Sequence, residues 1–86
     1  MASETPKLKV RIINPDQILY EGEADYLMIP SKHGMLGLMP SHTPMFAEIR
    51  TGDIHMKVGT GAEQTFPVIS GVAKIKDNEV MILIGA

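Results

Sequence analysis

The chain has 86 residues, 44% of them hydrophobic and 5% aromatic, with no cysteine and a formal net charge of −2 at pH 7. This length gives one domain with a thin core, and the lack of cysteine excludes disulfide bridges and zinc–thiolate sites. The slight negative charge provides no field for binding nucleic acid, and no apolar run reaches the roughly 20 residues of a membrane-spanning helix. We therefore expect no nucleic acid as a partner, and contact with a membrane only through another protein.

The first third of the chain alternates apolar and polar residues with the period of two that is typical of strands. After a polar lead at residues 1–6, the expected strands are Leu8–Asn14, which ends at the turn signal Asn14-Pro15-Asp16, then Ile18–Glu21 and Glu23–Ile29. The carboxylates of Glu21, Glu23 and Asp25 also alternate. We expect them to share one face of a solvated edge strand.

Further strands are expected at Met45–Ile49, Ile54–Val58, Gln64–Ser70, Val72–Lys76 and Val80–Ile84. Tight hairpin turns are expected at Thr51-Gly52-Asp53, between the strands Met45–Ile49 and Ile54–Val58, and at Asp77-Asn78. Pro67 predicts an edge strand or a bulge. No long stretch has the period of 3.6 that is typical of an amphipathic helix. The pattern predicts a single all-β sandwich domain over residues 1–86.

The run Gly34-Met35-Leu36-Gly37-Leu38-Met39-Pro40-Ser41-His42-Thr43-Pro44 places two glycines, two prolines and one histidine between expected strands. Glycine permits positive φ or close backbone approach, and proline fixes φ, so the run specifies one backbone path. By alternation, we expect Leu36 and Leu38 to face the core and Met35 and Met39 to face away. Exposed methionines would suit an adaptable partner contact, and the alternative is that they all pack internally.

Catalytic and metal-binding patterns are weak in this sequence. His33, His42 and His55 have no metal-ligand spacing, Ser31 and Ser41 lie in no nucleophile elbow, and the glycine-rich run leads into a strand rather than a helix that would bind phosphate. One enzymatic alternative is a small metal-dependent, cupin-like protein with His42, Glu48 and a further histidine as ligands. Another alternative is a generic β-sandwich adaptor module.

The glycine-rich run resembles the Gly-x-Leu-Gly-x-x-Pro-x-His-x-Pro signature of the epsilon subunit of rotary (F-type) ATP synthases. The segments Leu19–Ala24, Ile49–Ile54, Ile69–Ala73 and Asn78–Leu83 resemble the family in the same order and spacing. The resemblance implies the ten-stranded β-sandwich of two sheets that forms the epsilon N-terminal domain. It also implies a non-catalytic subunit of the central stalk, without cofactor or metal, that couples proton or sodium ion translocation to ATP synthesis.

The resemblance further implies two sets of contact residues. Contact with the c-ring of the membrane sector maps to Ser31, Lys32, His33, Gly34, Met35 and Leu36, and contact with the gamma subunit maps to Asn14, His42, Thr43, Pro44, Met45 and Ala47. The implied location is peripheral, on the cytoplasmic face of a bacterial inner membrane. At two points the sequence departs from the family, and there the family's properties are not applied to it. Because the expected sandwich domain accounts for residues 1–86, we do not expect the family's C-terminal helical domain, with its inhibitory and ATP-sensing roles, within this sequence. Met35 replaces a residue that is often polar or acidic in the family, which favours a packing contact.

Overall fold

The computed structural model of the chain describes residues 7–40, 44–59 and 63–85. Over these residues it contains nine strands and no helix: β1 (Leu8–Ile13), β2 (Ile18–Ala24), β3 (Tyr26–Ser31), β4 (Gly34–Leu38), β5 (Met45–Ile49), β6 (Gly52–Lys57), β7 (Glu63–Val68), β8 (Gly71–Lys76) and β9 (Glu79–Ile84). The expected all-β class is confirmed. Within the same part of the chain, no helix is long and apolar enough to cross a bilayer.

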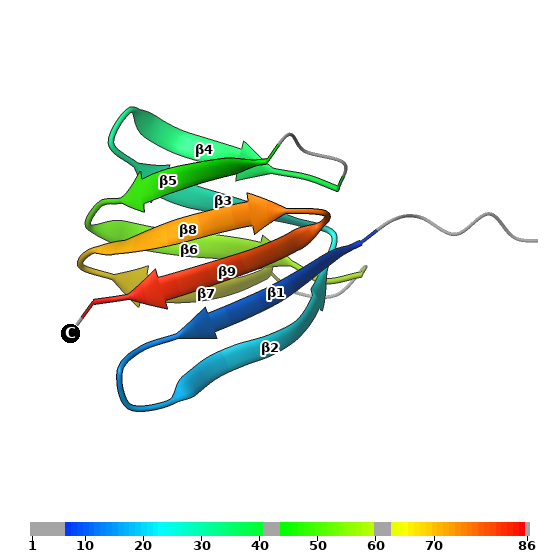
Figure 1. Ribbon diagram of the computed structural model, residues 1–86, viewed down its shortest axis with the longest axis horizontal. Coiled ribbons are helices and arrows are strands. Elements are labelled where there is room, and N and C mark those ends of the chain that lie inside the picture. Colours follow the sequence, from blue (N-terminus) through cyan, green and yellow to red (C-terminus); the bar gives the residue numbers. More distant parts are fainter. Residues whose placement is uncertain (1–6, 41–43, 60–62, 86) are drawn as a thin grey trace, which may run out of the picture.

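The strands form one sheet that folds over itself into two layers (Figure 1). Their order is β2-β1-β9-β8-β5-β3-β6-β7, and β4 pairs with β3 outside this path. The sheet turns between β5 and β3, which are joined through the single pair Ser31 and Ile49. We call β2-β1-β9-β8-β5 the front layer and β4-β3-β6-β7 the back layer. Strands β1 and β9 pair in parallel, although they are the first and last strands of the described chain.

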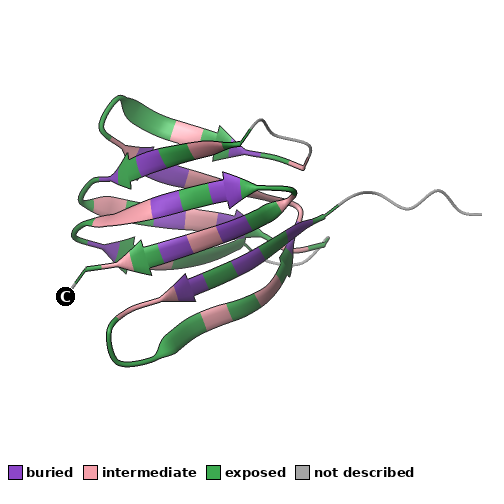
Figure 2. Ribbon diagram, viewed as in Figure 1, coloured by how far each residue is buried: buried purple, intermediate pink, exposed green. Residues whose placement is uncertain are grey.

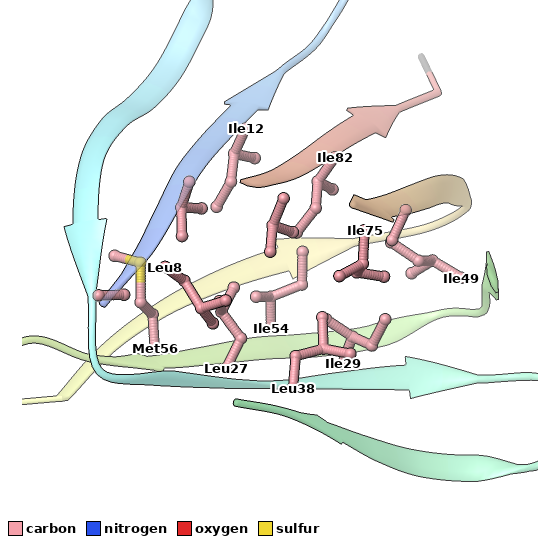
Figure 3. Close-up of a cluster of buried hydrophobic side chains, with 14 of the residues drawn as sticks. Leu8, Ile12, Leu27, Ile29, Leu38, Ile49, Ile54, Met56, Ile75 and Ile82 are labelled. Atoms are coloured by element: carbon pink, nitrogen blue, oxygen red, sulfur yellow. The ribbon is translucent and has the colours of Figure 1, made fainter. Parts of the chain in front are cut away.

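The core lies between the two layers and is built by the alternation that the sequence shows. In β1, for example, Leu8, Val10 and Ile12 are buried, while Lys9 and Arg11 are exposed (Figure 2). The largest fully buried side chains come from both layers (Figure 3): Leu8, Ile12, Leu27, Ile29, Leu38, Ile49, Ile54, Met56, Ile75, Val80 and Ile82. Each such side chain contributes about 1.5–3 kcal/mol through burial. No polar or charged residue of the described chain is buried.

The two ends of the sheet meet through side chains. Tyr20 of β2 and Phe66 of β7 pack with ring centroids 6.0 Å apart and an interplanar angle of 59°. The Tyr20 hydroxyl donates a hydrogen bond of 2.9 Å to the carbonyl oxygen of Glu23. Strand β7 is an end strand, as Pro67 predicts, and β2 is the solvated end strand expected from Glu21 and Glu23. Asp25, which was expected on the same strand face, lies instead at the bend between β2 and β3.

Three local features differ from the sequence-based expectation, and one turn agrees with it. The hairpin expected at Thr51-Gly52-Asp53 does not form, because β5 pairs with β8 and β3 whereas β6 pairs with β7 and β3. Strand β2 continues through Gly22 to Ala24, and the first half of the glycine-rich run is strand β4 rather than loop. In β4 the backbone pairs with β3 along its whole length, so the ladder overrides the low strand propensity of glycine. Asp77 and Asn78 have φ of 53° and 62°, the backbone of the two-residue hairpin turn expected there.

Candidate interaction surfaces

The outward face of the front layer carries the most unusual surface of the described chain. Strand pairing aligns Phe46 of β5 with Lys74 of β8, and Lys74 with Met81 of β9. The row continues to Arg11 of β1 and Glu21 of β2. Because side chains alternate along a strand, all of these residues point away from the core. We call this set the central row of the front face.

One end of the front face is apolar. Phe46 and Leu83 are 68% and 44% exposed, Val72 is half-buried, and Val72 pairs directly with Leu83. These three side chains border a shallow hollow of about 540 Å³. The exposed Glu48, which pairs with Val72 across the strands, also lines it. A monomer seldom leaves a phenylalanine so exposed beside other apolar side chains, so this group is a candidate contact surface. We call Phe46, Val72 and Leu83 the apolar patch.

The other end of the front face is charged, and its charges are largely matched. A second hollow of about 850 Å³ lies over β2, β1, β9 and β8. Arg11 Nη2 forms an ion pair of 2.7 Å with Glu21 Oε2, and Lys9 lies opposite both Glu23 and Glu79 in the strand register. The alternating signs neutralise one another, so this end provides no field for polyanions.

The β3–β4 turn, where the c-ring contact is expected, is a compact structure at one end of the sandwich. The Ser31 hydroxyl donates to the carbonyl oxygen of Gly34 at 2.7 Å and accepts from the N–H of His33 at 3.2 Å. Gly34 has φ of 109°, which favours glycine over any other residue. Lys32 and His33 are exposed at the tip. The turn therefore presents two polar side chains on a fixed backbone.

The glycine-rich run places its apolar side chains as alternation predicts. Leu38 is fully buried and Leu36 packs against the core. Met35 and Met39 are 51% and 61% exposed. The expected division of this strand into a core face and an outer face is confirmed, and Met35 projects beside the β3–β4 turn.

The residues expected at a gamma contact are spread over the molecule. Asn14 closes the β1–β2 turn, where its Oδ1 accepts from the N–H groups of Asp16 and Gln17 at 2.8 Å each. Pro44 is exposed, Met45 packs against the core, and Ala47 is buried. His42 and Thr43 lie outside the described residues. On β5 the exposed side chain is Phe46, which the sequence interpretation did not single out, although the alternation of Met45, Phe46 and Ala47 was a signal for it.

The metal-binding alternative receives no support from the described residues. No group of three histidine, aspartate or glutamate side chains among them is placed to hold a metal ion. Glu48 is exposed on β5 of the front layer, whereas His55 lies on β6 of the back layer, between the inward-facing Ile54 and Met56. These two side chains therefore point to opposite sides of the sandwich.

A carboxylate ties the two layers together at the end opposite the β3–β4 turn. Asp25 Oδ1 accepts from Lys7 Nζ at 2.7 Å, and Asp25 Oδ2 accepts from the backbone N–H of Gly59 at 2.8 Å. The hydrogen bond from Lys7 lowers the pKa of the Asp25 carboxyl, and the Gly59 N–H and the charge of Lys57 lower it further. The same pair raises the pKa of Lys7. Asp25 thus belongs to a structural contact.

Comparisons of the sequence with known proteins agree on one family. Residues 7–86 match the model of the ATP synthase delta/epsilon chain β-sandwich domain. The ATP synthase epsilon chain of Leptospira interrogans serovar copenhageni is 39% identical over 77 residues, which are 90% of this chain and 60% of the relative. The epsilon chain of Gloeothece citriformis is 38% identical over 77 residues, 90% of this chain and 55% of the relative.

Solved structures show the same fold at low sequence identity. A chain in the Euglena gracilis mitochondrial ATP synthase (OSCP/F1/c-ring) superposes with a TM-score of 0.86 and 14% identity, covering 96% of this chain and 53% of that chain. A chain in the Tetrahymena thermophila mitochondrial ATP synthase (central stalk and c-ring) gives a TM-score of 0.78 and 12% identity, covering 98% and 67%. The chain spans somewhat more than half the length of the curated relatives described above.

Proposed function

Because the chain belongs to the delta/epsilon family of ATP synthase subunits, we propose that it is a non-catalytic, epsilon-type component of the central stalk. In this role it binds the gamma subunit and the c-ring, and it helps to couple proton or sodium ion translocation to ATP synthesis. The observation that carries the proposal is the family match over residues 7–86, which includes every described strand. The proposed location is peripheral, on the cytoplasmic face of a bacterial inner membrane, through these partners.

Two of the expected gamma-contact residues, Asn14 and Pro44, favour the front face as the gamma-binding surface, whereas Met45 and Ala47 face the core. Asn14 follows β1 and Pro44 precedes β5, and these strands lie on either side of β9 and β8. Strand β1 ends, and strand β5 begins, at opposite ends of the layer (Figure 1). A partner that touches both must cross the outer surface of β9 and β8. It would then cover the apolar patch, whose burial is the largest available source of affinity on this face.

The end of the sandwich that carries the β3–β4 turn suits contact with a second partner. The β5–β6 turn lies beside it, because the N–H of Arg50 donates to the carbonyl oxygen of Pro30 at 2.8 Å. Thr51 in turn donates from its hydroxyl to the carbonyl oxygen of Ile69 at 2.8 Å. Adjacent loops are thus held to one another by hydrogen bonds. We propose that the c-ring contacts this end through Ser31, Lys32, His33, Gly34, Met35 and Leu36, with Met35 making a packing contact.

The architecture fits a part that transmits torque. A two-layer sandwich with a close-packed core deforms little under load because interior packing has low compressibility. The gamma-facing surface and the c-ring-facing turn are built on the same sheet, so a force applied at one is carried to the other through paired strands.

Co-expression with the gamma subunit from the same organism, followed by size-exclusion chromatography, tests the first contact. Co-elution in a one-to-one complex is the expected result. Separate elution, with gamma shown to be folded, would contradict the proposal and leave a β-sandwich adaptor of another kind.

The c-ring contact is tested with the purified gamma complex and c-rings in detergent. Met35→Glu is expected to leave gamma binding unchanged and to weaken binding to the c-ring. Met39→Glu is the matched control, because Met39 is similarly exposed but lies outside the proposed contact. Equal effects of both variants would argue against this turn as the c-ring contact.

A further inference from the structure

Lys74 holds an unusual place in the central row of the front face. Its cross-strand neighbours are Phe46 on one side and Met81 on the other. Along its own strand, the nearest residues on the same face are Val72 and Lys76. The nearest neighbours of Lys74 on the sheet are therefore three apolar side chains and a second cation. It lies between the apolar patch and the charged hollow, which it also lines.

The other cations on this face have nearby carboxylates. Arg11 forms its ion pair with Glu21, Lys9 lies between Glu23 and Glu79 in the register, and Lys76 lies opposite Glu79. For Lys74, the carboxylates of Glu48 and Glu79 occupy diagonal positions in the register, where Cα atoms are about 7–8 Å apart and long side chains can still meet. Among the described residues, neither is within ion-pair distance of it.

A partner that covers the apolar patch must also cover Lys74. Removing the ammonium group from water without a compensating group is unfavourable, because neither Phe46 nor Met81 can accept its hydrogen bonds. A carboxylate on the partner would restore the lost interactions, and the surrounding apolar side chains would exclude water and strengthen the attraction. Charge complementarity therefore predicts an acidic side chain on the partner opposite Lys74.

We propose that Lys74 selects the partner by pairing with an aspartate or glutamate that apolar residues flank on the gamma subunit. This inference rests on the proposed function, since gamma is taken as the occupant of the front face. Lys74 gives the contact its register and specificity, while the apolar patch supplies most of the buried area.

The test is the affinity of the folded chain for gamma, measured by isothermal titration, for wild type and for Lys74→Met. Methionine keeps most of the length of the lysine side chain and removes its charge. If gamma presents a carboxylate, that carboxylate is left buried and unpaired, and affinity falls about 30-fold or more. If gamma presents only apolar groups, Lys74→Met relieves the cost of desolvation and binds equally well or more tightly, which would overturn the proposal.

Two further measurements complete the experiment. Lys76→Met is the matched control, because Lys76 faces Glu79 in the charge-matched part of the surface; a change of less than about threefold is expected. The salt dependence of binding should be shallower for Lys74→Met than for wild type. Failure of wild type itself to bind gamma would refute the proposed function, whereas binding of wild type with undiminished binding of Lys74→Met would refute this inference alone.

Discussion

The outward faces of the two layers are built by the same alternation but have different chemistry. On the back layer, the polar side chains of β6 and β7 contact one another: His55 Nδ1 lies 3.6 Å from Glu63 Oε1 and 3.5 Å from Thr65 Oγ1. On the front layer, Phe46 and Leu83 are exposed without an apolar cover, and Lys74 forms no ion pair with any described residue. The outward side chains of β6 and β7 thus interact with one another, and the exposed apolar side chain of the back layer, Met35, lies beside the β3–β4 turn. Phe46 and Leu83 of the front layer lie on the broad face of the sheet and gain most from a partner. The two outward faces differ in whether neighbouring polar and charged side chains interact with one another.

The largest expected effect is on the free energy of unfolding, and it comes from a substitution that disturbs the β8–β9 pairing in the front layer. A Cβ atom on Gly71 would lie 2.4 Å from the carbonyl oxygen of Leu83 and 3.2 Å from Ile84 Cα. Backbone atoms cannot yield without breaking the β8–β9 pairing, so Gly71→Ala is expected to reduce the free energy of unfolding by about 3 kcal/mol. Urea denaturation measures it. In the back layer, a Cβ on Gly37 would meet only Met28 Sδ at 3.4 Å, so Gly37→Ala should cost far less; equal losses would contradict the structure.

Adding a negative charge to each outward face tests directly whether only the front face binds gamma. Phe46→Asp places a carboxylate in the apolar patch and should weaken gamma binding by about 2 kcal/mol, roughly 30-fold. Since Phe46 is 68% exposed, folding should be unaffected. Thr65→Asp adds the same charge to the back face and should leave binding unchanged. Equal weakening in a titration of both variants would show that the front face is not the gamma-binding surface.

A smaller effect is expected at the contact that joins the layers. The pKa of Asp25 is lowered in the folded protein, mainly by its hydrogen bond from Lys7, so its carboxylate stabilises the fold above its unfolded pKa of about 3.9. That stabilisation is lost as the pH falls through the lower, folded pKa. Asp25→Asn should therefore be less stable than wild type at pH 7, with a difference that shrinks below about pH 4. Thermal unfolding between pH 2 and pH 7 measures this, and a constant difference would contradict it.

The smallest effect is expected on the back face. The His55–Glu63 pair is 3.6 Å apart, and its side chains are 37% and 46% exposed, so solvent screens it strongly. Glu63→Gln should change the free energy of unfolding by less than about 0.5 kcal/mol and should not alter gamma binding. Loss of binding in this variant would mean that the back face also contacts the partner.

Much of the fold follows from the sequence because alternation and turn chemistry act locally. The buried positions of β1 and the hairpin turn at Asp77 and Asn78 were both predictable on these grounds. Strand β4 was not predicted, because Gly34 and Gly37 have low strand propensity and only the ladder to β3 makes the segment extended. The parallel pairing of β1 with β9 could not be predicted either, since no local signal in the sequence specifies which strands become neighbours.

The candidate site was predictable only in part. The outward direction of Met35 and Met39 followed from alternation, and the structure confirms it. The surface formed by Phe46, Lys74 and Met81 requires three strands that are distant in sequence to lie in one register. A sequence pattern can state that each of these residues faces outward, but their neighbours become known only when the sheet is assembled.

The pairing of β1 with β9 also has a consequence for how the chain reaches its fold. Synthesis proceeds from the N-terminus, so Leu8–Ile13 is made long before Glu79–Ile84, its parallel neighbour. Until then β1 has only the β2 hairpin as a partner, and an isolated hairpin is at best marginally stable in water. The front layer therefore closes late, through contacts of high sequence separation that are slow to form. During that interval, nascent chains expose the apolar residues of β1 and are at the greatest risk of aggregation.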